Sequence, residues 1–218
     1  MKTKDIFLSD ESIAIELIRE YEYPFEILPN VKDYILKLGK TLDEDYEEKG
    51  ENVWIHKSAK VAPNASITGP CIIDADAEIR HCAFIRGSAI IGKGSVLGNS
   101  CEIKNSILFD NVQVPHFNYV GDSILGAHSH MGAGSITSNV KSDKKLVVIK
   151  NGAEKLETGI KKVGAFLGDY VEIGCNSLLN PGTIVGPHTN VYPLTSVRGV
   201  IPSHSIVKTM SNIVRKVD

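Results

Sequence analysis

The sequence lacks the features that mark several classes of protein. Among its 218 residues, no apolar run approaches the ~20 residues that a membrane-spanning helix needs. The first residues, MKTKDIFLSDES, become acidic too early for a secretory signal peptide. We therefore expect a cytoplasmic protein that has no membrane partner.

Strong net charge and cysteine frameworks are also missing. The formal net charge is -2, so no electrostatic argument favours nucleic acid as a partner. The four cysteines form no CxxC pair and no zinc-finger spacing; they are Cys71, Cys82, Cys101 and Cys175. Reduced thiols in a cytoplasmic protein are the expectation.

Residues 1–51 carry helical patterns and no glycine-rich loop of the kind that cradles phosphate, so no nucleotidyltransferase activity is expected. Ser9, followed by two acidic residues, is typical of a helix N-cap. Asn30 indicates a second helix start, with Leu28 and Tyr34 placed to form a hydrophobic staple.

From residue 55 onward, an apolar residue recurs at every sixth position. These anchors are Ile55, Val61, Ile67, Ile73, Ile79, Ile85, Ile91, Leu97, Ile103 and Phe109, and later Leu167, Ile173, Leu179, Val185, Val191 and Val197. A six-residue period fits neither a helix nor an alternating strand. It is typical of a solenoid in which three strand-and-turn repeats close one triangular coil. The period predicts a parallel β-helix without giving its hand. The alternative, a β-sandwich, would show turns at irregular spacings of about 8–12 residues.

The repeat is interrupted at two places. Between Val114 and Met131 the anchors are five or six residues apart, a distortion that solenoids tolerate at loops and sites. From about 140 to 163 the anchors disappear, and LVVIKNGAEKLETG predicts a β-hairpin with Asn151-Gly152 as a type I′ turn.

The chain therefore divides into three parts. A helical extension covers residues 1–51, and its acidic end, LDEDYEEKGEN, is expected to be a solvated linker. The β-helix covers 52–208 with the hairpin inserted, and 209–218 form a C-terminal tail. Apolar residues between the anchors, as in AFIRGSAII and NSLLNPGTIV, favour a homotrimer.

Three motifs in the β-helix, HFNYVGD, HMGAGSITSN and AFLGDYVEIGCNS, carry a resemblance to a known family. With the repeats, they resemble the acetyltransferase domain of the bifunctional glucosamine-1-phosphate acetyltransferase / N-acetylglucosamine-1-phosphate uridyltransferase enzymes. The hairpin is closer to archaeal-type sugar-1-phosphate nucleotidyltransferases that carry the same second domain. The resemblance spans roughly 52–208, and helical residues stand where the family has its nucleotidyltransferase domain. It implies a left-handed β-helix, a homotrimer with active sites between subunits, and acetyl-CoA as co-substrate.

The resemblance also implies roles for single residues. The family's general base falls on His116, its active-site tyrosine on Tyr119, and a substrate-contacting asparagine on Asn139. Its contacts to the substrate's phosphate side fall on Arg86 and Lys104.

The remaining site positions match the family less closely. His130 stands at a substrate-binding position where the family has asparagine, which leaves the identity of the sugar open. On the acetyl-CoA side, Cys175, Pro193 and Lys208 fall on cofactor-binding positions.

For one pair of these residues, the spacing in the sequence supports phosphate binding independently of the resemblance. Arg86 and Lys104 each follow an anchor and are 18 residues apart, so they are expected on adjacent coils about 4.8 Å apart. Two cations at that distance repel unless an anion lies against them, and a phosphate would suit. The alternative is a pair of solvated surface charges.

These features predict an acetyl-CoA-dependent acyltransferase that acetylates the amine of a phosphorylated amino sugar or nucleotide amino sugar. A neutral imidazole is suited to take the amine's proton, which points to His116. The oxyanion needs donors, from a backbone N–H or the Tyr119 hydroxyl. Direct transfer needs no enzyme nucleophile, so Cys175 need not be catalytic.

Two other functions remain open at this point. One is a non-catalytic trimeric β-helix that binds a ligand or serves assembly. The other is a metal-dependent, carbonic anhydrase-like enzyme using histidines from the set His81, His116, His128 and His130. His128 and His130 are two apart and are expected on one strand face, but the spacing does not reproduce that family, so no metal is expected. We interpret His56, His188 and His204 as turn or surface residues.

Overall fold

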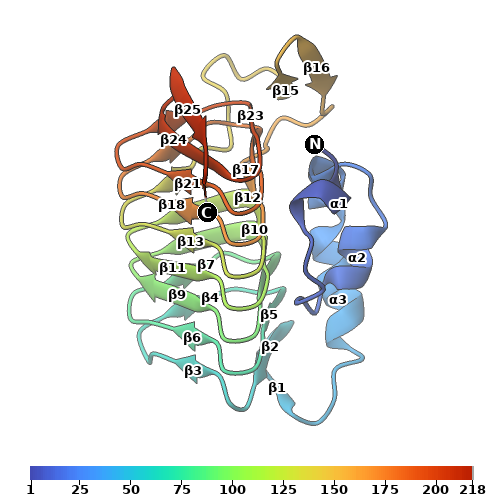
Figure 1. Ribbon diagram of the computed structural model, residues 1–218. Coiled ribbons are helices and arrows are strands. Elements are labelled where there is room, and N and C mark those ends of the chain that lie inside the picture. The colour runs from blue at the N-terminus through green and yellow to red at the C-terminus, as the bar shows by residue number, and fades with distance from the viewer. Residues whose placement is uncertain (218) are drawn as a thin grey trace.

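The computed structural model describes residues 1–217, and most of the chain forms a parallel β-helix of stacked triangular coils (Figure 1). In the first coils the ladder joins residues 18 apart, such as Ile55 with Ile73 and Ile73 with Ile91. The anchors Ile73, Ile85 and Ile91 are fully buried. A helical layer lies along one side, and a hairpin arm projects near the last coils (Figure 1). The predicted class, a mainly β protein built as a parallel β-helix with N-terminal helices and an inserted hairpin, is confirmed.

Three ladders of strands form the three faces of the β-helix. The covered face, named for the helices that lie on it, contains β2 (Val53–His56), β5 (Cys71–Ile73), β8 (Ala89–Ile91), the second halves of β10 (Glu102–Leu108) and β12 (Tyr119–Leu125), β17 (Ala165–Leu167), β20 (Thr183–Val185) and β23 (Val200–Ile201), with β1 (Tyr46–Gly50) at its edge. The open face contains β4 (Ser66–Ile67), β7 (Phe84–Ile85), the first halves of β10 and β12, β14 (Ile136–Thr137), β19 (Leu178–Leu179) and β22 (Ser196–Val197). The third face contains β3 (Lys60–Val61), β6 (Glu78–Ile79), β9 (Val96–Asn99), β11 (Gln113–His116), β13 (His130–Met131), β18 (Glu172–Ile173), β21 (Asn190–Val191), β24 (Ser205–Thr209) and β25 (Asn212–Arg215).

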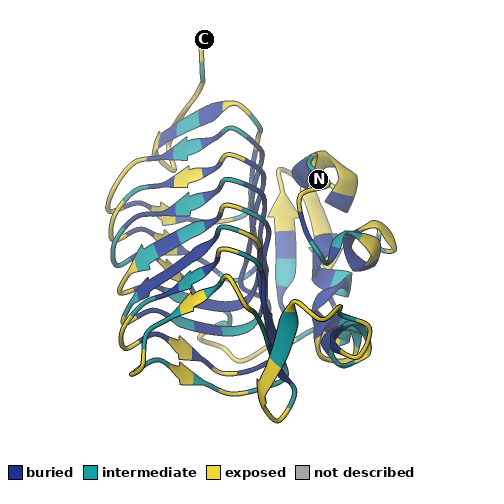
Figure 2. Cartoon of the chain, turned by 90° about the horizontal axis from the view of Figure 1, so that it is seen from below, coloured by how far each residue is buried: buried dark blue, intermediate teal, exposed yellow. Residues whose placement is uncertain are grey.

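The N-terminal layer is built from short helices. They are α1 (Thr3–Ile6), α2 (Ile15–Arg19) and α3 (Val31–Gly39), with the 3-10 turns η1 (Pro24–Glu26) and η2 (Leu28–Asn30) between the last two. Their buried sides are turned toward the β-helix (Figure 2). No helix within residues 1–217 is long and apolar enough to cross a bilayer.

The strands of the covered face are apolar on both sides, which is why a second layer must lie on them. Inward anchors alternate with an outward row that is also almost fully buried: Trp54, Ile72, Ile90, Ile107, Ile124, Phe166 and Ile184. At one end of this row, Gly39 of α3 lies so close to the Trp54 ring that any side chain there would overlap it. The helices therefore belong to the core of the fold.

The helix predicted to start after Ser9 begins later, as α2 at Ile15. The backbone N–H of Ser9 donates to Asp169 of the β-helix at 2.8 Å, so Ser9 belongs to a contact between layers and caps no helix. Ser12 instead accepts the N–H of Ala14 at 3.1 Å, directly before α2. Asn30 does stand at the start of α3, although its amide donates to a carbonyl of the preceding turn rather than capping the helix.

Two segments expected to lie outside regular structure form strands. The acidic stretch interpreted as a linker contains β1, which pairs with β2 and whose Tyr46 hydroxyl donates to Asp74. The segment interpreted as a C-terminal tail contains β25, which pairs antiparallel with β24. Each strand covers an end of a ladder, where backbone groups would otherwise lack partners.

The first departure from the six-residue period comes earlier in the chain than predicted. Leu108 pairs with Ile91, so this coil is one residue shorter than 18 and Phe109 is not an inward anchor. The Phe109 ring instead stacks on Phe7 of the N-terminal layer, with centroids 5.1 Å apart.

The hairpin arm leaves the β-helix where predicted, with its turn displaced by one residue. Its strands are β15 (Val148–Asn151) and β16 (Glu154–Glu157). Asn151 pairs with Glu154, so the turn residues are Gly152-Ala153 rather than Asn151-Gly152. Gly152 has the positive φ, 59°, that such turns require.

Candidate functional site

The side chains of Tyr119, Asp122 and Asn139 meet at one edge of the open face. Tyr119 begins β12 and Asn139 closely follows β14, its neighbour in the ladder. The Asn139 amide donates to the Tyr119 hydroxyl at 3.2 Å and to Asp122 Oδ2 at 2.5 Å. Asp122 is only 3% exposed and also accepts from the Asn105 amide at 2.8 Å. These bonds hold the phenol and the amide in a fixed orientation.

The environment of Tyr119 keeps its hydroxyl protonated. Burial raises the pKa of Tyr119, while the hydrogen bond from Asn139 acts in the opposite direction. An ordinary tyrosine already titrates near pH 10, so this hydroxyl remains a donor at neutral pH. It can therefore stabilise a developing oxyanion.

Arg86 and Lys104 lie on adjacent coils, as their spacing indicates, because Ile85 pairs with Ile103. Each cation already has a carboxylate: Arg86 Nη1 donates to Glu102 at 2.6 Å, and Lys104 Nζ lies 3.6 Å from Asp122. Their mutual repulsion is thus offset within the chain, and a phosphate is not needed to explain their proximity.

Asp122 and Glu102 were not assigned any role from the sequence. Asp122 belongs to the quoted HFNYVGD motif, so the motif itself was a signal. Glu102 lies two residues before Lys104 in β10, and strand alternation puts both side chains on the same side. Only the ladder shows that Glu102 reaches Arg86 of the neighbouring coil.

His116 ends β11 at the corner between the third face and the open face. Its backbone N–H donates to the Asn118 amide oxygen at 3.0 Å, and its carbonyl accepts from Gly134 at 2.9 Å. Its side chain is exposed, and within residues 1–217 its imidazole has no hydrogen-bond partner. The ring is therefore available to a ligand.

His130 lies apart from this group, on β13 of the third face. It pairs with Gln113, three residues before His116, which places it about 10 Å along the strand from the level of His116. Its Nδ1 lies 2.9 Å from Glu172 Oε2. The structure does not bring His130 to Tyr119 and Asn139 within one chain.

The predicted cofactor residues come together on the third face. Ile173 pairs with Val191, so Cys175 and Pro193 lie side by side two residues further on. Val191 pairs in turn with Val207, which precedes Lys208. All three side chains are exposed on neighbouring coils and could line one ligand.

The other histidines lie mainly at a corner. His128, His188 and His204 have left-handed backbones, and their rings form one stack with Tyr170, with successive centroids 4.8, 5.0 and 4.9 Å apart. The expectation that His128 and His130 share a strand face is wrong, because His128 lies in the turn before β13. In the described part of the chain, no three His, Cys, Asp or Glu side chains gather as a metal-binding group.

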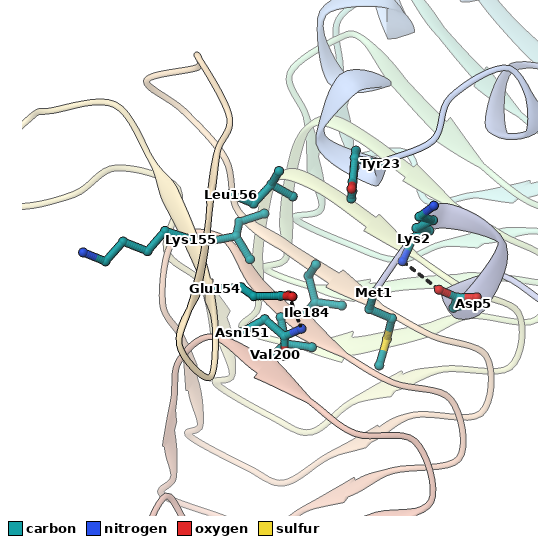
Figure 3. Close-up of a pocket in the computed structure, with 11 residues that line it drawn as sticks. Met1, Lys2, Asp5, Tyr23, Asn151, Glu154, Lys155, Leu156, Ile184 and Val200 are labelled. Carbon is teal, nitrogen blue, oxygen red and sulfur yellow. Dashed lines mark hydrogen bonds between the residues drawn. The ribbon is translucent and has the colours of Figure 1, made fainter.

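A cleft of about 600 Å³ lies on the covered face between the N-terminal segment and the hairpin arm (Figure 3). Its apolar lining includes Met1, Leu156, Ile184 and Val200. Polar groups at its rim bond to each other: the Lys2 N–H donates to Asp5 at 2.9 Å, and the Asn151 amide donates to Glu154 at 3.3 Å. None of the predicted site residues lines this cleft.

The chain is similar to curated bifunctional proteins. It is 32% identical over 220 residues to a bifunctional sugar-1-phosphate nucleotidylyltransferase/acetyltransferase of Sulfurisphaera tokodaii, covering 87% of this chain and 55% of that protein. It is 37% identical over 170 residues to a bifunctional protein GlmU of Methanococcus maripaludis, covering 77% and 41%. The chain thus spans about half the length of these relatives or less.

A solved structure and a family model complete the comparison. The polySia specific acetyltransferase NeuO has a TM-score of 0.50 at 13% identity, covering 78% of each chain, and so shows a common fold. The predicted left-handed β-helix and the predicted resemblance to the bifunctional enzymes are confirmed. Residues 67–201, more than half of the chain, match the model described as the GMPPB C-terminal domain, and the chain belongs to this family.

Proposed function

We propose that the chain transfers the acetyl group of acetyl-CoA to the amine of a phosphorylated amino sugar or a nucleotide amino sugar. The main support is the hydrogen-bonded set of Tyr119, Asp122 and Asn139, with the exposed imidazole of His116 at the adjoining corner. The name of the Sulfurisphaera tokodaii relative includes acetyltransferase activity.

The proposed reaction uses these groups without a covalent enzyme intermediate. The acceptor amine attacks the thioester carbonyl, and His116 takes the amine's proton as the N–C bond forms. The tetrahedral oxyanion accepts a hydrogen bond from the Tyr119 hydroxyl. When the C–S bond breaks, the imidazolium returns the proton to the CoA thiolate.

Arg86 and Lys104 are the proposed contacts for the acceptor's phosphate, and Asn139 for another part of the acceptor. His130 joins them only from a neighbouring copy of the chain, in the homotrimer proposed below. Arg86 can give a phosphate two parallel N–H bonds, whereas Lys104 gives a point charge. Arg86 Nη1 is already paired with Glu102 at 2.6 Å, so a phosphate bound there must share or replace this contact. The acceptor's phosphate therefore competes with a carboxylate of the chain.

We further propose a homotrimer in which a neighbouring copy closes the acetyl-CoA site over Cys175, Pro193 and Lys208. Large apolar side chains stand exposed on the open face and its corner: Phe84, Phe117, Ile136, Leu178 and Leu194. By contrast, Ile90 of AFIRGSAII is covered by the chain's own helices and offers nothing to a partner. Light scattering that gives a monomer at micromolar concentration would rule out this assembly and the shared site.

The activity is tested with acetyl-CoA and a panel of acceptors that includes glucosamine-1-phosphate and nucleotide amino sugars. Release of the CoA thiol must accompany formation of the N-acetylated acceptor, detected by mass spectrometry. The expected result is transfer by the wild-type protein and its loss in His116→Ala. A folded, oligomeric protein that acetylates none of these acceptors would overturn the proposal.

A further inference from the structure

A second basic site lies where the hairpin arm leaves the open face. A pocket of about 160 Å³ there is lined by three basic residues, Lys141, Lys150 and Arg198, and by no acidic residue among those described. Lys141 is paired with Asp143 at 3.1 Å, and Arg198 donates to the neutral Asn180 amide oxygen at 2.9 Å. Within residues 1–217, no carboxylate lies within 4.0 Å of Lys150 or Arg198.

Packing holds the arm in place over this pocket. A Cβ on Gly182 would lie 2.9 Å from Val147, and one on Gly199 would lie 2.8 Å from the Lys150 carbonyl oxygen. The first strand of the arm therefore lies directly on two successive corners of the β-helix. Val147 and Ile149 are buried, so by strand alternation the exposed side chain of Lys150 lies on the other side of the strand, and Lys150 lines the pocket.

The ladder relates this pocket to the candidate site. Thr137 pairs with Leu179 and Leu179 with Val197, so Ser138, Asn180 and Arg198 form one column across three coils. Arg198 thus lies two strand spacings, about 10 Å, from the level of Asn139. The pocket and the group around Tyr119 share one edge of the β-helix.

The charges of the two positions differ. Arg86 and Lys104 are each compensated by a carboxylate, whereas Lys150 and Arg198 are not. An anionic group entering the pocket meets cations without displacing any carboxylate from Lys150 or Arg198, and two nearby cations favour a doubly charged group.

We propose that Lys141, Lys150 and Arg198 bind a pyrophosphate or phosphate group of one of the two substrates. The binding of an anion follows from the pocket itself, whereas its assignment to a substrate rests on the proposed acetyl transfer. Two sources share this chemistry: the phosphates of acetyl-CoA and the pyrophosphate of a nucleotide amino sugar.

Binding of the anion is tested without catalysis, by calorimetry with inorganic pyrophosphate at fixed ionic strength. Lys150→Ala and Arg198→Ala should each weaken binding roughly tenfold or more, the usual effect of losing a charge-assisted bond. Lys60→Ala is the control, since Lys60 lies on β3 at the opposite end of the β-helix from the arm (Figure 1), and should change binding less than about twofold. Gly199→Ala keeps all three cations but displaces the arm, and should also weaken binding. Equal affinities for wild type, Lys150→Ala and Arg198→Ala would overturn the anion site, whatever the enzyme's activity.

Kinetics with truncated substrates distinguishes the two sources. If the site binds the donor, Lys150→Ala raises the KM for acetyl-CoA but not for acetyl-pantetheine, which has no pyrophosphate. If it binds the acceptor, the KM rises for a nucleotide amino sugar but not for the amino sugar monophosphate. Weaker pyrophosphate binding with every KM unchanged would overturn the assignment to a substrate while leaving acetyl transfer intact.

Discussion

The covered face and the open face share two strands, yet one is covered by helices and the other carries the candidate site. β10 and β12 each contribute one half to both faces. On the covered half the outward residues are Ile107 and Ile124, which are fully buried under the helical layer. On the open half they include Lys104 and Tyr119, which make polar contacts at the candidate site.

This difference shows that the inward and outward positions of the repeat are independent. The anchors need only stack on the anchors of the next coil, whichever face they belong to. The outward residues then decide whether a face receives a second layer or remains open. Asp169 also ties the helical layer to the β-helix, because it accepts the N–H groups of Leu8 and Ser9 at 2.7 and 2.8 Å and that of Ala127 at 2.9 Å. One buried carboxylate thereby joins the N-terminal segment to two coils.

The largest expected effect on stability is on the covered face. Phe109→Ala removes the buried ring that stacks on Phe7, and should lower the free energy of unfolding by about 3–5 kcal/mol. Urea unfolding measures this, and kcat of the folded variant should be unchanged. Leu8→Ala, in the same layer but with a side chain 61% exposed, is the control and should change stability by less than about 0.5 kcal/mol. A small loss in Phe109→Ala would show that the helices are not part of the core.

At the corner of the open face, a substitution should lower activity and leave stability unchanged. His116→Ala should lower kcat by roughly 10²–10⁴-fold, the usual contribution of a general base, with little change in KM. Its unfolding midpoint should match the wild type, because the side chain is exposed and its ring has no partner among residues 1–217. Near-normal turnover would mean that the base lies elsewhere, and His130 would be the next residue to replace.

A smaller effect is expected on the KM for the acceptor when its proposed phosphate contact, Arg86, is replaced. Arg86→Ala should raise the KM for a phosphorylated acceptor roughly ten- to hundredfold and leave that for an unphosphorylated amino sugar unchanged. Glu102→Gln removes the competing carboxylate, which pairs with Arg86 at 2.6 Å, and should lower the KM for the phosphorylated acceptor. If Arg86→Ala weakens both acceptors equally, Arg86 has only a structural role.

The smallest expected effect is on the pH dependence of kcat, through the Tyr119 hydroxyl. Since burial raises the pKa of Tyr119, its hydroxyl stays protonated beyond the ordinary value near 10. Its ionisation should therefore cause no fall in kcat between about pH 8 and 10, and Tyr119→Phe should lower kcat without changing the shape of the profile there. An alkaline fall in the wild type that disappears in Tyr119→Phe would contradict this.

Much of the candidate site could be read from motifs, but its charge balance could not. The resemblance of HFNYVGD and HMGAGSITSN to a known family's motifs selected His116, Tyr119 and Asn139. The bonds of Asn139 to Tyr119 and Asp122 join residues 20 and 17 positions apart, and depend on the one-residue slip between coils. The arm's contact with Gly182 and Gly199, which brings Lys150 to the pocket that Arg198 also lines, has no signal in the local sequence.

The sequence by itself determined the β-helix, because a six-residue period of buried anchors is a local pattern that stacking alone satisfies. It also determined the position of the hairpin, through the loss of anchors and an Asn-Gly pair. Only the tertiary structure decided which face the helices cover, that the acidic stretch and the tail become edge strands, and which carboxylate meets each cation. These outcomes depend on contacts between residues far apart in the chain, whose energies no local window contains: the Ser9 N–H donates to Asp169 rather than leaving Ser9 to cap a helix, and the Phe109 ring stacks on Phe7 rather than entering the coil.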